Sequence, residues 1–262
     1  MNPPLVICSD VGKAWQTADT PVVALEGINL GIARREFVVF LGPSGCGKST
    51  LLYLIAGLEQ ATSGTIESGG ARVTGPGTDR GLIFQESSLF PWMTVGENVT
   101  FGLKLQGVAA LERRQVAAGL LRKVGLGDVA DKRPDQLSGG MRQRAAMARA
   151  LALRPEVLLL DEPFAALDVQ TRSKMQQFLV EVWRDSGASM LFVTHHIDEA
   201  VALADRVVVF TARPGRIKSI VPVGLPRPRD PRSPAFHALS DHLTDLLRDE
   251  VDRAFAEQER VR

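Results

Sequence analysis

Short, uninterrupted apolar runs recur along the chain. They are rich in Val, Ile and Leu and hardly alternate with polar residues, which is typical of strands buried on both faces of a largely parallel sheet. The strands predicted in this way cover residues 22–25, 28–32, 36–41, 81–84, 157–160, 190–194 and 207–210. The pattern therefore favours an α/β fold.

Helical spacing of apolar residues marks two other parts of the chain. Four apolar residues follow Lys48 at helical spacing, and Gly57 is expected to end that helix. Between residues 85 and 155 the sequence is rich in helix formers and predicts helices over 95–105, 111–124 and 139–153. Because this stretch lies between two predicted strands, residues 86–155 are interpreted as a helical insertion in the α/β core.

The end of the chain, from Leu225, begins with the segment PRPRDPRSP, which predicts an irregular linker. Ser233 and Pro234 then supply an N-cap and a first-turn proline. Apolar residues follow at helical spacing, so an amphipathic helix is expected that either packs on its own domain or binds a partner. These features divide the chain into a domain of residues 1–225 and a C-terminal linker and helix of residues 226–262.

Charge and composition narrow the class of function. The formal net charge is +1, so no overall basic field points to nucleic acid or to an anionic membrane. Two cysteines, Cys8 and Cys46, are too few for a disulfide scaffold and suit a reducing cytosol. The N-terminus lacks the pattern of a signal peptide and no apolar run is long enough to cross a bilayer, so any membrane role is expected to be peripheral, through a partner.

A phosphate-binding loop stands between a predicted strand and a predicted helix. Residues 42–49, GPSGCGKS, match the pattern G-x-x-x-x-G-K-[ST] in full. The glycines let backbone amides close around a polyphosphate, and the N-terminus of the following helix adds its dipole. Lys48 would reach the β- and γ-phosphates, and the Ser49 hydroxyl would bind Mg²⁺. Cys46 is interpreted as a small spacer in this loop rather than as a redox group.

Two carboxylates follow the apolar run at 157–160, in the segment VLLLDEP. Asp161 would hold Mg²⁺, often through water, as in other phosphate-loop ATPases. Glu162 lies one residue further, where the strand ends, and could orient and deprotonate an attacking water.

The base of the nucleotide is expected to be adenine. The asparagines are Asn2, Asn29 and Asn98, and none precedes a lysine, so the guanine-reading motif NKxD is absent. Trp15 lies ahead of the phosphate loop, where its ring could stack on adenine. The same residue could instead be an ordinary packed tryptophan, and the sequence leaves both interpretations open.

A second glycine-rich stretch, LSGGMRQR at 137–144, lacks a lysine and would be an incomplete phosphate site if it acted on its own chain. The order GPSGCGKST, Gln85, LSGGMRQR, LLLDEP, ALD (Ala166 to Asp168) and Thr194-His195 resembles the nucleotide-binding subunit of ATP-binding cassette (ABC) transporters, over residues 5 to about 225. The resemblance implies a RecA-like P-loop NTPase core with a largely parallel sheet, an N-terminal antiparallel β part and an inserted helical subdomain. It also implies a head-to-tail homodimer, in which LSGGMRQR completes the ATP site of the partner subunit.

The resemblance assigns roles to residues outside the phosphate loop as well. Gln85 would contact Mg²⁺ and the attacking water, His195 would touch the γ-phosphate, and Asp168 would lie at the dimer interface. The catalytic residues implied are Lys48, Gln85, Glu162 and His195, and the Mg²⁺ ligands implied are Ser49, Gln85 and Asp161. The residues implied to bind ATP are Trp15, Gly42, Pro43, Ser44, Gly45, Cys46, Gly47, Lys48, Ser49, Thr50, Ser138, Gly139, Gly140 and Asp168.

Two positions depart from the family pattern. His196 stands where an aspartate is usual, directly after the histidine assigned to the γ-phosphate. Because adjacent side chains on a strand point to opposite faces, His195 and His196 are not expected to form a metal site. Arg35-Glu36 stands where Gly-Glu is usual and is interpreted as a variation in a turn.

Three segments are similar to the ATPases of importers for nitrate, sulfonates and taurine. They are PGTDRGLIFQ at 76–85, LFPWMTVGENV at 89–99 and ARPGRI at 212–217. Phe90-Pro91-Trp92 is expected on the surface of the helical insertion, where such subunits receive a short coupling helix of the permease. The alternative, that Trp92 belongs to the core, stays open at this point.

The leading hypothesis is an ATP-hydrolysing subunit of a bacterial importer for a small anion, held peripherally at the cytoplasmic face of the plasma membrane. Its implied partners are a second copy of the chain, permease subunits and, through them, an extracytoplasmic substrate-binding protein, with no nucleic acid. The alternative is a soluble ABC-type ATPase, or a regulatory module, that is not attached to a permease. The sequence does not choose among the anions, because the substrate would contact the permease and the binding protein rather than this chain.

Overall fold

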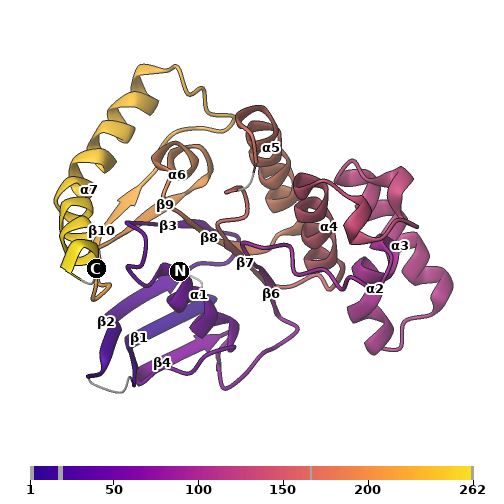
Figure 1. Cartoon of the computed structure of the whole chain (residues 1–262), viewed down its shortest axis with the longest axis horizontal. Helices are drawn as coiled ribbons and strands as arrows, with labels where there is room; N and C mark the ends of the chain where they lie inside the picture. The colour runs from indigo at the N-terminus through magenta and orange to yellow at the C-terminus, as the bar shows by residue number, and fades with distance from the viewer. Residues whose placement is uncertain (1–2, 17–19, 166, 261–262) are drawn as a thin grey trace. The chain divides into compact units, whose positions relative to one another are not determined.

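The computed structural model (Figure 1) describes residues 3–16, 20–165 and 167–260. The chain divides into two compact units. The first unit combines Met1–Gly77 with Ser189–Arg262, and the second is Thr78–Ala188. The helical stretch predicted at 86–155 falls wholly within the second unit, and residues 226–262 group with the first. Ala166, in the ALD motif, lies outside the described residues.

The first unit contains two groups of strands. One group is an antiparallel sheet in the order β2-β1-β4-β5. In the other, β3 pairs in parallel with both β8 and β9, and β10 pairs with β9 in the antiparallel sense. The strands are β1 (Val6–Trp15), β2 (Val22–Ile32), β3 (Phe37–Leu41), β4 (Ser63–Ser68), β5 (Ala71–Arg72), β8 (Ser189–Thr194), β9 (Arg206–Phe210) and β10 (Ile217–Pro222).

The buried strands predicted at 36–41, 190–194 and 207–210 and the expected N-terminal antiparallel sheet are confirmed, whereas burial alternates along β2 and the strands of that sheet differ from those predicted. Every residue of β3 and β8 is buried, and in β9 only the first is not. The strands predicted at 22–25 and 28–32 are one continuous strand, β2. The sequence did not predict β1, because its pairing with β2 shifts between Cys8 and Val11, where Asp10 has φ 50°, and the shift interrupts the alternation that marks a strand.

The helices of the first unit are α1 (Lys48–Ala56), α6 (Ile197–Leu203) and α7 (Pro234–Arg260). Helix α1 ends at Gly57 with φ 78°, as predicted. At the start of α7 the Ser233 hydroxyl accepts a hydrogen bond from the Phe236 amide at 3.3 Å. Phe236, Leu243 and Leu247 are buried, and α7 contacts α6 and β9. The C-terminal helix therefore packs on its own unit.

The segment predicted as a linker is hydrogen-bonded to the end of α6. Residues 223–233 are all described, and none of them is in a helix or strand. The Arg229 guanidinium donates to the carbonyls of Val201 and Ala204, each at 2.7 Å. Burial, with the nearby charge of Arg227 adding to it, lowers the pKa of Arg229 to about 10. Hydrogen bonds of Arg229 thus hold this irregular segment against the end of α6, and the segment leads into α7.

Helix α7 also carries a buried carboxylate, Glu250, which is 3% exposed. Its Oε1 lies 2.7 Å from Nζ of Lys218 on β10, and its Oε2 accepts from the backbone amide of Ala212 at 2.9 Å. Burial by itself would raise the pKa of Glu250, but the hydrogen bonds from Lys218 and Ala212 outweigh it, so the pKa lies below its ordinary value.

Acid is therefore expected to weaken the first unit through Glu250. Because the folded-state pKa is depressed, the carboxylate stabilises the fold above its ordinary pKa, and this stabilisation is lost as the pH falls through the folded-state value. The charged groups that face Glu250 are Lys218 and Arg253. In urea unfolding at decreasing pH, the wild type should lose free energy of unfolding more steeply than Glu250→Gln. Equal slopes for the two would contradict the assignment, and Asp249→Asn, at an exposed neighbour, is the control.

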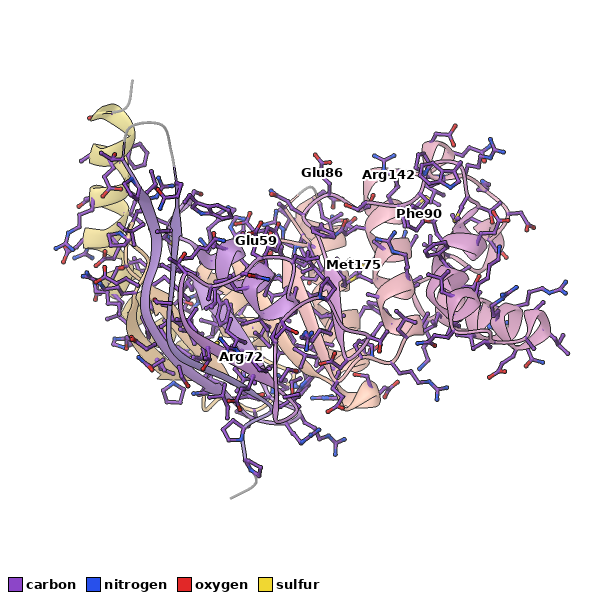
Figure 2. All side chains as sticks on the ribbon, turned by 90° about the horizontal axis from the view of Figure 1, so that it is seen from below. Glu59, Arg72, Glu86, Phe90, Arg142 and Met175 are labelled. Carbon is purple, nitrogen blue, oxygen red and sulfur yellow. The ribbon has the colours of Figure 1, made fainter. Side chains whose placement is uncertain are left out.

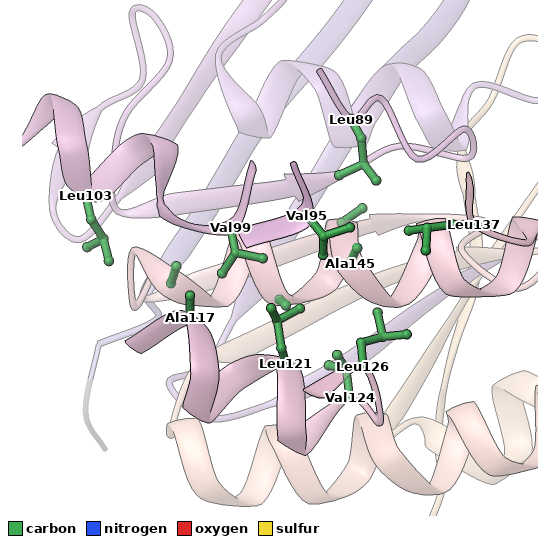
Figure 3. Close-up of a cluster of buried hydrophobic side chains, with 13 residues drawn as sticks. Leu89, Val95, Val99, Leu103, Ala117, Leu121, Val124, Leu126, Leu137 and Ala145 are labelled. Carbon is green, nitrogen blue, oxygen red and sulfur yellow. The ribbon is translucent and has the colours of Figure 1, made fainter. Parts of the chain in front are cut away.

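The second unit is mainly helical. Strands β6 (Arg80–Ile83) and β7 (Val157–Asp161) pair in parallel. The α-helices are α2 (Val95–Leu105), α3 (Ala110–Lys123), α4 (Gly139–Ala152) and α5 (Val169–Ser186), with 3₁₀ turns at Gly127–Val129 and Pro134–Gln136. A cluster of buried apolar side chains from α2, α3 and α4 forms the core of its helical part, with Leu121 and Ala145 fully buried in it (Figure 3).

Candidate functional site

The phosphate loop lies in the first unit, between β3 and α1. Strand β3 is buried throughout and delivers the chain to Gly42, and α1 begins at Lys48. Gly47 forms the N-cap with φ 99°, and no side chain caps the helix. The first amides of α1 therefore have no intrahelical acceptor and can bind an anion, with the helix dipole in the favourable direction.

Packing behind the loop explains why Gly47 must be a glycine. A Cβ on Gly47 would lie 2.8 Å from the Ala24 carbonyl oxygen and 2.7 Å from Leu25 Cδ2, both on β2. A side chain there would push the loop off the strand, and φ 99° lies outside the ordinary range of L-residues. Ser44 and Gly45, at the tip of the loop, are exposed, whereas Pro43 is buried.

Lys48 is buried, with 4% exposed, and its ammonium group is hydrogen-bonded within the loop. Its Nζ donates to the carbonyls of Gly42 and Pro43, both at 2.8 Å, and lies 3.7 Å from Cys46 Sγ. An ammonium group inside a glycine-rich loop that leads into a helix N-terminus is the combination that a polyphosphate requires. Burial raises the pKa of Cys46, which keeps it a thiol and supports its interpretation as a spacer. Ser49 and Thr50 are half-buried on the first turn of α1.

Trp15, the candidate for stacking on adenine, is the last residue of β1. Its side chain is 40% exposed, and Nζ of Lys13 lies 4.1 Å from the ring centroid. Lys13 also pairs with Glu59 at 3.1 Å. Trp15 is therefore not a buried core residue, and its stacking on a base stays a prediction.

The expectation that the side chains of His195 and His196 point to opposite faces is wrong. His195 is exposed and directly follows β8, but the rings of His195 and His196 have centroids 4.1 Å apart rather than facing opposite ways. The strand ends at Thr194, so the alternation of strand side chains no longer applies. The Thr194 hydroxyl donates to Glu199 at 2.6 Å and accepts from the His196 amide at 3.0 Å, which turns the chain into α6. Among the described residues, no group of three or more His, Cys, Asp and Glu could hold a metal ion.

In the second unit, β7 ends at the two predicted carboxylates. Asp161 is buried, with 4% exposed, and Glu162 is half-buried. Glu162 has φ 42°, in the left-handed region, which costs a non-glycine residue about 1–3 kcal/mol. Such strain is retained where the surrounding structure holds a side chain in a required position, and it clusters at functional sites.

The stretch LSGGMRQR forms the start of α4 and lies beside the start of α5. Ser138 is the N-cap of α4 and accepts from the Met141 amide at 3.3 Å. A Cβ on Gly140 would lie 3.1 Å from Leu167, the residue before Asp168. Asp168 caps α5 by accepting from the amides of Gln170 and Thr171, and hydrogen bonds from the Thr171 side chain and backbone lower its pKa. The structure thus brings Ser138–Gly140 and Asp168 together as two neighbouring helix starts.

Gln85 is exposed, two residues beyond β6, and its segment is held by α4. Gln143, buried within LSGGMRQR, donates to the Phe84 carbonyl at 3.2 Å, and Arg149 donates to the Ser88 carbonyl at 2.8 Å. The sequence did not single out either residue. A buried glutamine on an otherwise apolar helix face was the available signal, since buried amides need partners.

Mg²⁺ is compatible with the residues predicted to hold it. The donors are the hydroxyl of Ser49, the amide oxygen of Gln85 and the carboxylate of Asp161, all oxygen ligands as Mg²⁺ prefers. Mg²⁺ usually takes only one or two protein carboxylates and fills its shell with water and phosphate oxygens. The single buried carboxylate of Asp161 suits that requirement.

A phosphate loop with an internal lysine and a carboxylate-ended strand define an ATPase of the P-loop class. Residues 25–165 match the family model of the ABC transporter, and this chain belongs to that family. The chain is accordingly a nucleotide-binding ATPase. Among the described residues, no helix is both long and apolar enough to span a membrane.

Several known proteins are similar over most of the chain. An uncharacterized ABC transporter ATP-binding protein of Methanocaldococcus jannaschii is 52% identical over 239 residues, 91% of this chain and 90% of the relative. The nitrate import ATP-binding protein NrtD of Synechocystis sp. is 49% identical, covering 92% and 94%. The aliphatic sulfonates import ATP-binding protein SsuB of Bacillus licheniformis is 44% identical, covering 94% and 95%. A solved dimeric, post-hydrolysis ATP-binding cassette with ADP and Pi has a TM-score of 0.76 at 32% identity, covering 83% of this chain and 98% of that one.

Proposed function

We propose that this ATPase powers the import of a small anion, such as nitrate, an aliphatic sulfonate or taurine, from the cytoplasmic face of a permease. Two of the similar proteins are import ATP-binding proteins, for nitrate and for aliphatic sulfonates. An extracytoplasmic binding protein would deliver the anion to the permease. The identity of the anion would be decided there and not by this chain.

Each of the site residues described above would have a separate role in ATP hydrolysis. Lys48 and the amides of residues 42–50 would bind the phosphates, and Trp15 would stack on adenine. Ser49, Gln85 and Asp161 would hold Mg²⁺, which neutralises charge on the phosphates when bound. Glu162 would take the proton of the attacking water, and His195 would contact the γ-phosphate.

A head-to-tail dimer would complete each site. The similar solved cassette is dimeric, and Ser138 and Gly139 are exposed at the start of α4. Their stretch has helix-start donors but no positive side chain among Ser138, Gly139 and Gly140. It would therefore contribute to an ATP whose charge is already met by Lys48 of the other subunit.

The observation that carries the transport role is an exposed aromatic platform in the second unit. Trp92 is 67% exposed, and its ring centroid lies 5.6 Å from that of Phe90. The ring centroids of Phe90 and Phe101 lie 4.8 Å apart. Phe90 is labelled in Figure 2. The fully buried amide of Asn98 accepts from the Phe90 amide and donates to the Phe90 carbonyl, which fixes the backbone beneath the platform. A rigid aromatic side chain displayed to solvent is typical of a protein interface, here for the permease.

Trp92→Ala is expected to separate the subunit from its permease without impairing the ATPase. In cells that lack the native copy, uptake of labelled nitrate, alkanesulfonate or taurine should return with the wild type and stay at least about tenfold lower with Trp92→Ala, since truncating an aromatic interface anchor costs 2 kcal/mol or more. The tagged variant should also no longer co-purify with an integral membrane protein.

The matched control is Leu111→Ala, which removes an equally exposed apolar side chain, at 67%, from α3. It should transport as the wild type does. A Trp92→Ala protein that supports full uptake would contradict the docking role, and no uptake of any of the three anions with the wild type would contradict the proposed substrate class.

A further inference from the structure

A tight turn, residues 212–216, lies directly behind the phosphate loop, although about 170 residues separate them in the chain. A Cβ on Gly215 would lie only 2.0 Å from the carbonyl oxygen of Cys46. The Gly215 amide donates to the Ala24 carbonyl at 2.9 Å, and its carbonyl accepts from the Glu26 amide at 3.1 Å. The backbone of Gly215 is thus fixed between β2 and the phosphate loop.

The same turn reaches the tip of the phosphate loop through Arg213. Its Nη2 donates to the Gly45 carbonyl at 3.3 Å, while the side chain stays exposed. Thr211 closes the turn internally, because its hydroxyl donates to the Pro214 carbonyl and accepts from the Arg216 amide, both at 2.9 Å. The turn is therefore stiff, and it contacts the loop at two successive residues, Gly45 and Cys46.

The C-terminal helix holds the other side of this turn. The buried Glu250 carboxylate of α7 accepts from the Ala212 amide at 2.9 Å, and the same carboxylate pairs with Lys218 just beyond the turn. A continuous path of bonded groups thus runs from α7 through Ala212 and Arg213 to Gly45. All of its members belong to the first unit.

We propose that residues 212–216 position the phosphate loop for ATP, with Glu250 as their anchor, so that the C-terminal helix sets the nucleotide affinity. A glycine-rich loop loses conformational entropy when it closes on phosphate, and a fixed support removes part of that cost before the ligand binds. The proposal rests on the proposed role of residues 42–50 as the phosphate site. Arg213 and Glu250 are positioning residues, because neither is assigned a contact with ATP.

The test measures Mg-ATP binding by titration calorimetry on the full chain. Arg213→Ala and Glu250→Ala should each weaken ATP binding about two- to tenfold, the change that one lost hydrogen bond produces. Arg213→Lys, which keeps a cationic donor, should recover at least part of the affinity. The matched controls, Arg216→Ala in the same turn, which removes a pair with Glu26, and Asp249→Ala beside Glu250, should bind as the wild type does.

Amide hydrogen exchange supplies a readout that general destabilisation would not reproduce. In the nucleotide-free Arg213→Ala protein, exchange should rise in residues 42–49 and stay unchanged in β8 and β9. Unchanged ATP affinity in both variants, or an equal loss in the two controls, would overturn the proposal. Lys48→Ala tests the assumption that residues 42–50 bind phosphate. If that variant bound ATP with wild-type affinity, the assignment of the phosphate site would be wrong, and the positioning role that rests on it would be wrong too.

Discussion

Glu162→Gln is expected to bind ATP normally and to hydrolyse it about 10²- to 10⁴-fold more slowly, as removal of a positioned general base does. Glutamine keeps the size of the side chain and its hydrogen-bonding capacity but cannot accept the proton of the attacking water. With ATP and Mg²⁺ the variant should accumulate as a stable dimer, because the step that resets the dimer is blocked. Phosphate release and light scattering measure the two effects.

A second substitution at the same position distinguishes loss of the general base from a change in backbone conformation. Glu162 has φ 42°, which glycine adopts without steric cost. Glu162→Gly should therefore be equally inactive, with no fall in the thermal unfolding temperature that could account for the loss. Glu112→Gln, at an exposed position on α3, is the control for loss of a carboxylate. Near-normal turnover in Glu162→Gln, or an ATP-loaded variant that stays strictly monomeric, would contradict the assignment.

Two inactive variants are expected to restore activity when they are mixed. Lys48→Ala removes the phosphate-loop charge, and Ser138→Asp places a carboxylate where the γ-phosphate of the partner's ATP is proposed to lie. Aspartate is as good an N-cap as serine, so α4 should remain intact. In a head-to-tail dimer the mixed pair contains one site with both wild-type residues, and hydrolysis should rise well above that of either variant alone.

The control mixture pairs Lys48→Ala with the double variant Lys48→Ala, Ser138→Asp, which leaves no site with a wild-type phosphate loop. That mixture should stay inactive. If Ser138 served the ATP of its own chain, both mixtures would be equally inactive, and the completion of the site by the partner would be refuted. Phosphate release at matched total protein concentration distinguishes the two cases.

Local signals predicted much of the fold. The buried strands β3, β7, β8 and β9 and the helices α1, α2, α3 and α4 lie where apolar runs and helical spacing indicated, within a residue or so. Two helices, α5 and α6, were not predicted. For α5 the signals were present, since Asp168 caps it and Gly187 ends it with φ 67°. Only Met175, Leu179 and Val182 are buried on that helix, so its apolar stripe is narrow and its pattern weak.

Two details of the site could not be predicted because they depend on where an element ends or on distant packing. The histidine rings lie together because β8 stops at Thr194 and the strand period stops with it. Trp92 could be core or surface from its sequence alone, and the structure places it at the surface with 67% exposed.

The sequence by itself determined the chemistry: a phosphate loop with its lysine, a strand that ends in two carboxylates, and a helix start without a lysine of its own. These are patterns of adjacent residues, and their local conformation follows from their own backbone preferences. Only the tertiary structure showed that Arg213 and Gly215 contact the phosphate loop and that Glu250, on the last helix, accepts a hydrogen bond from the same turn. Such contacts join residues far apart in the chain, so they depend on how the strands and helices pack and leave no periodic signal in the sequence.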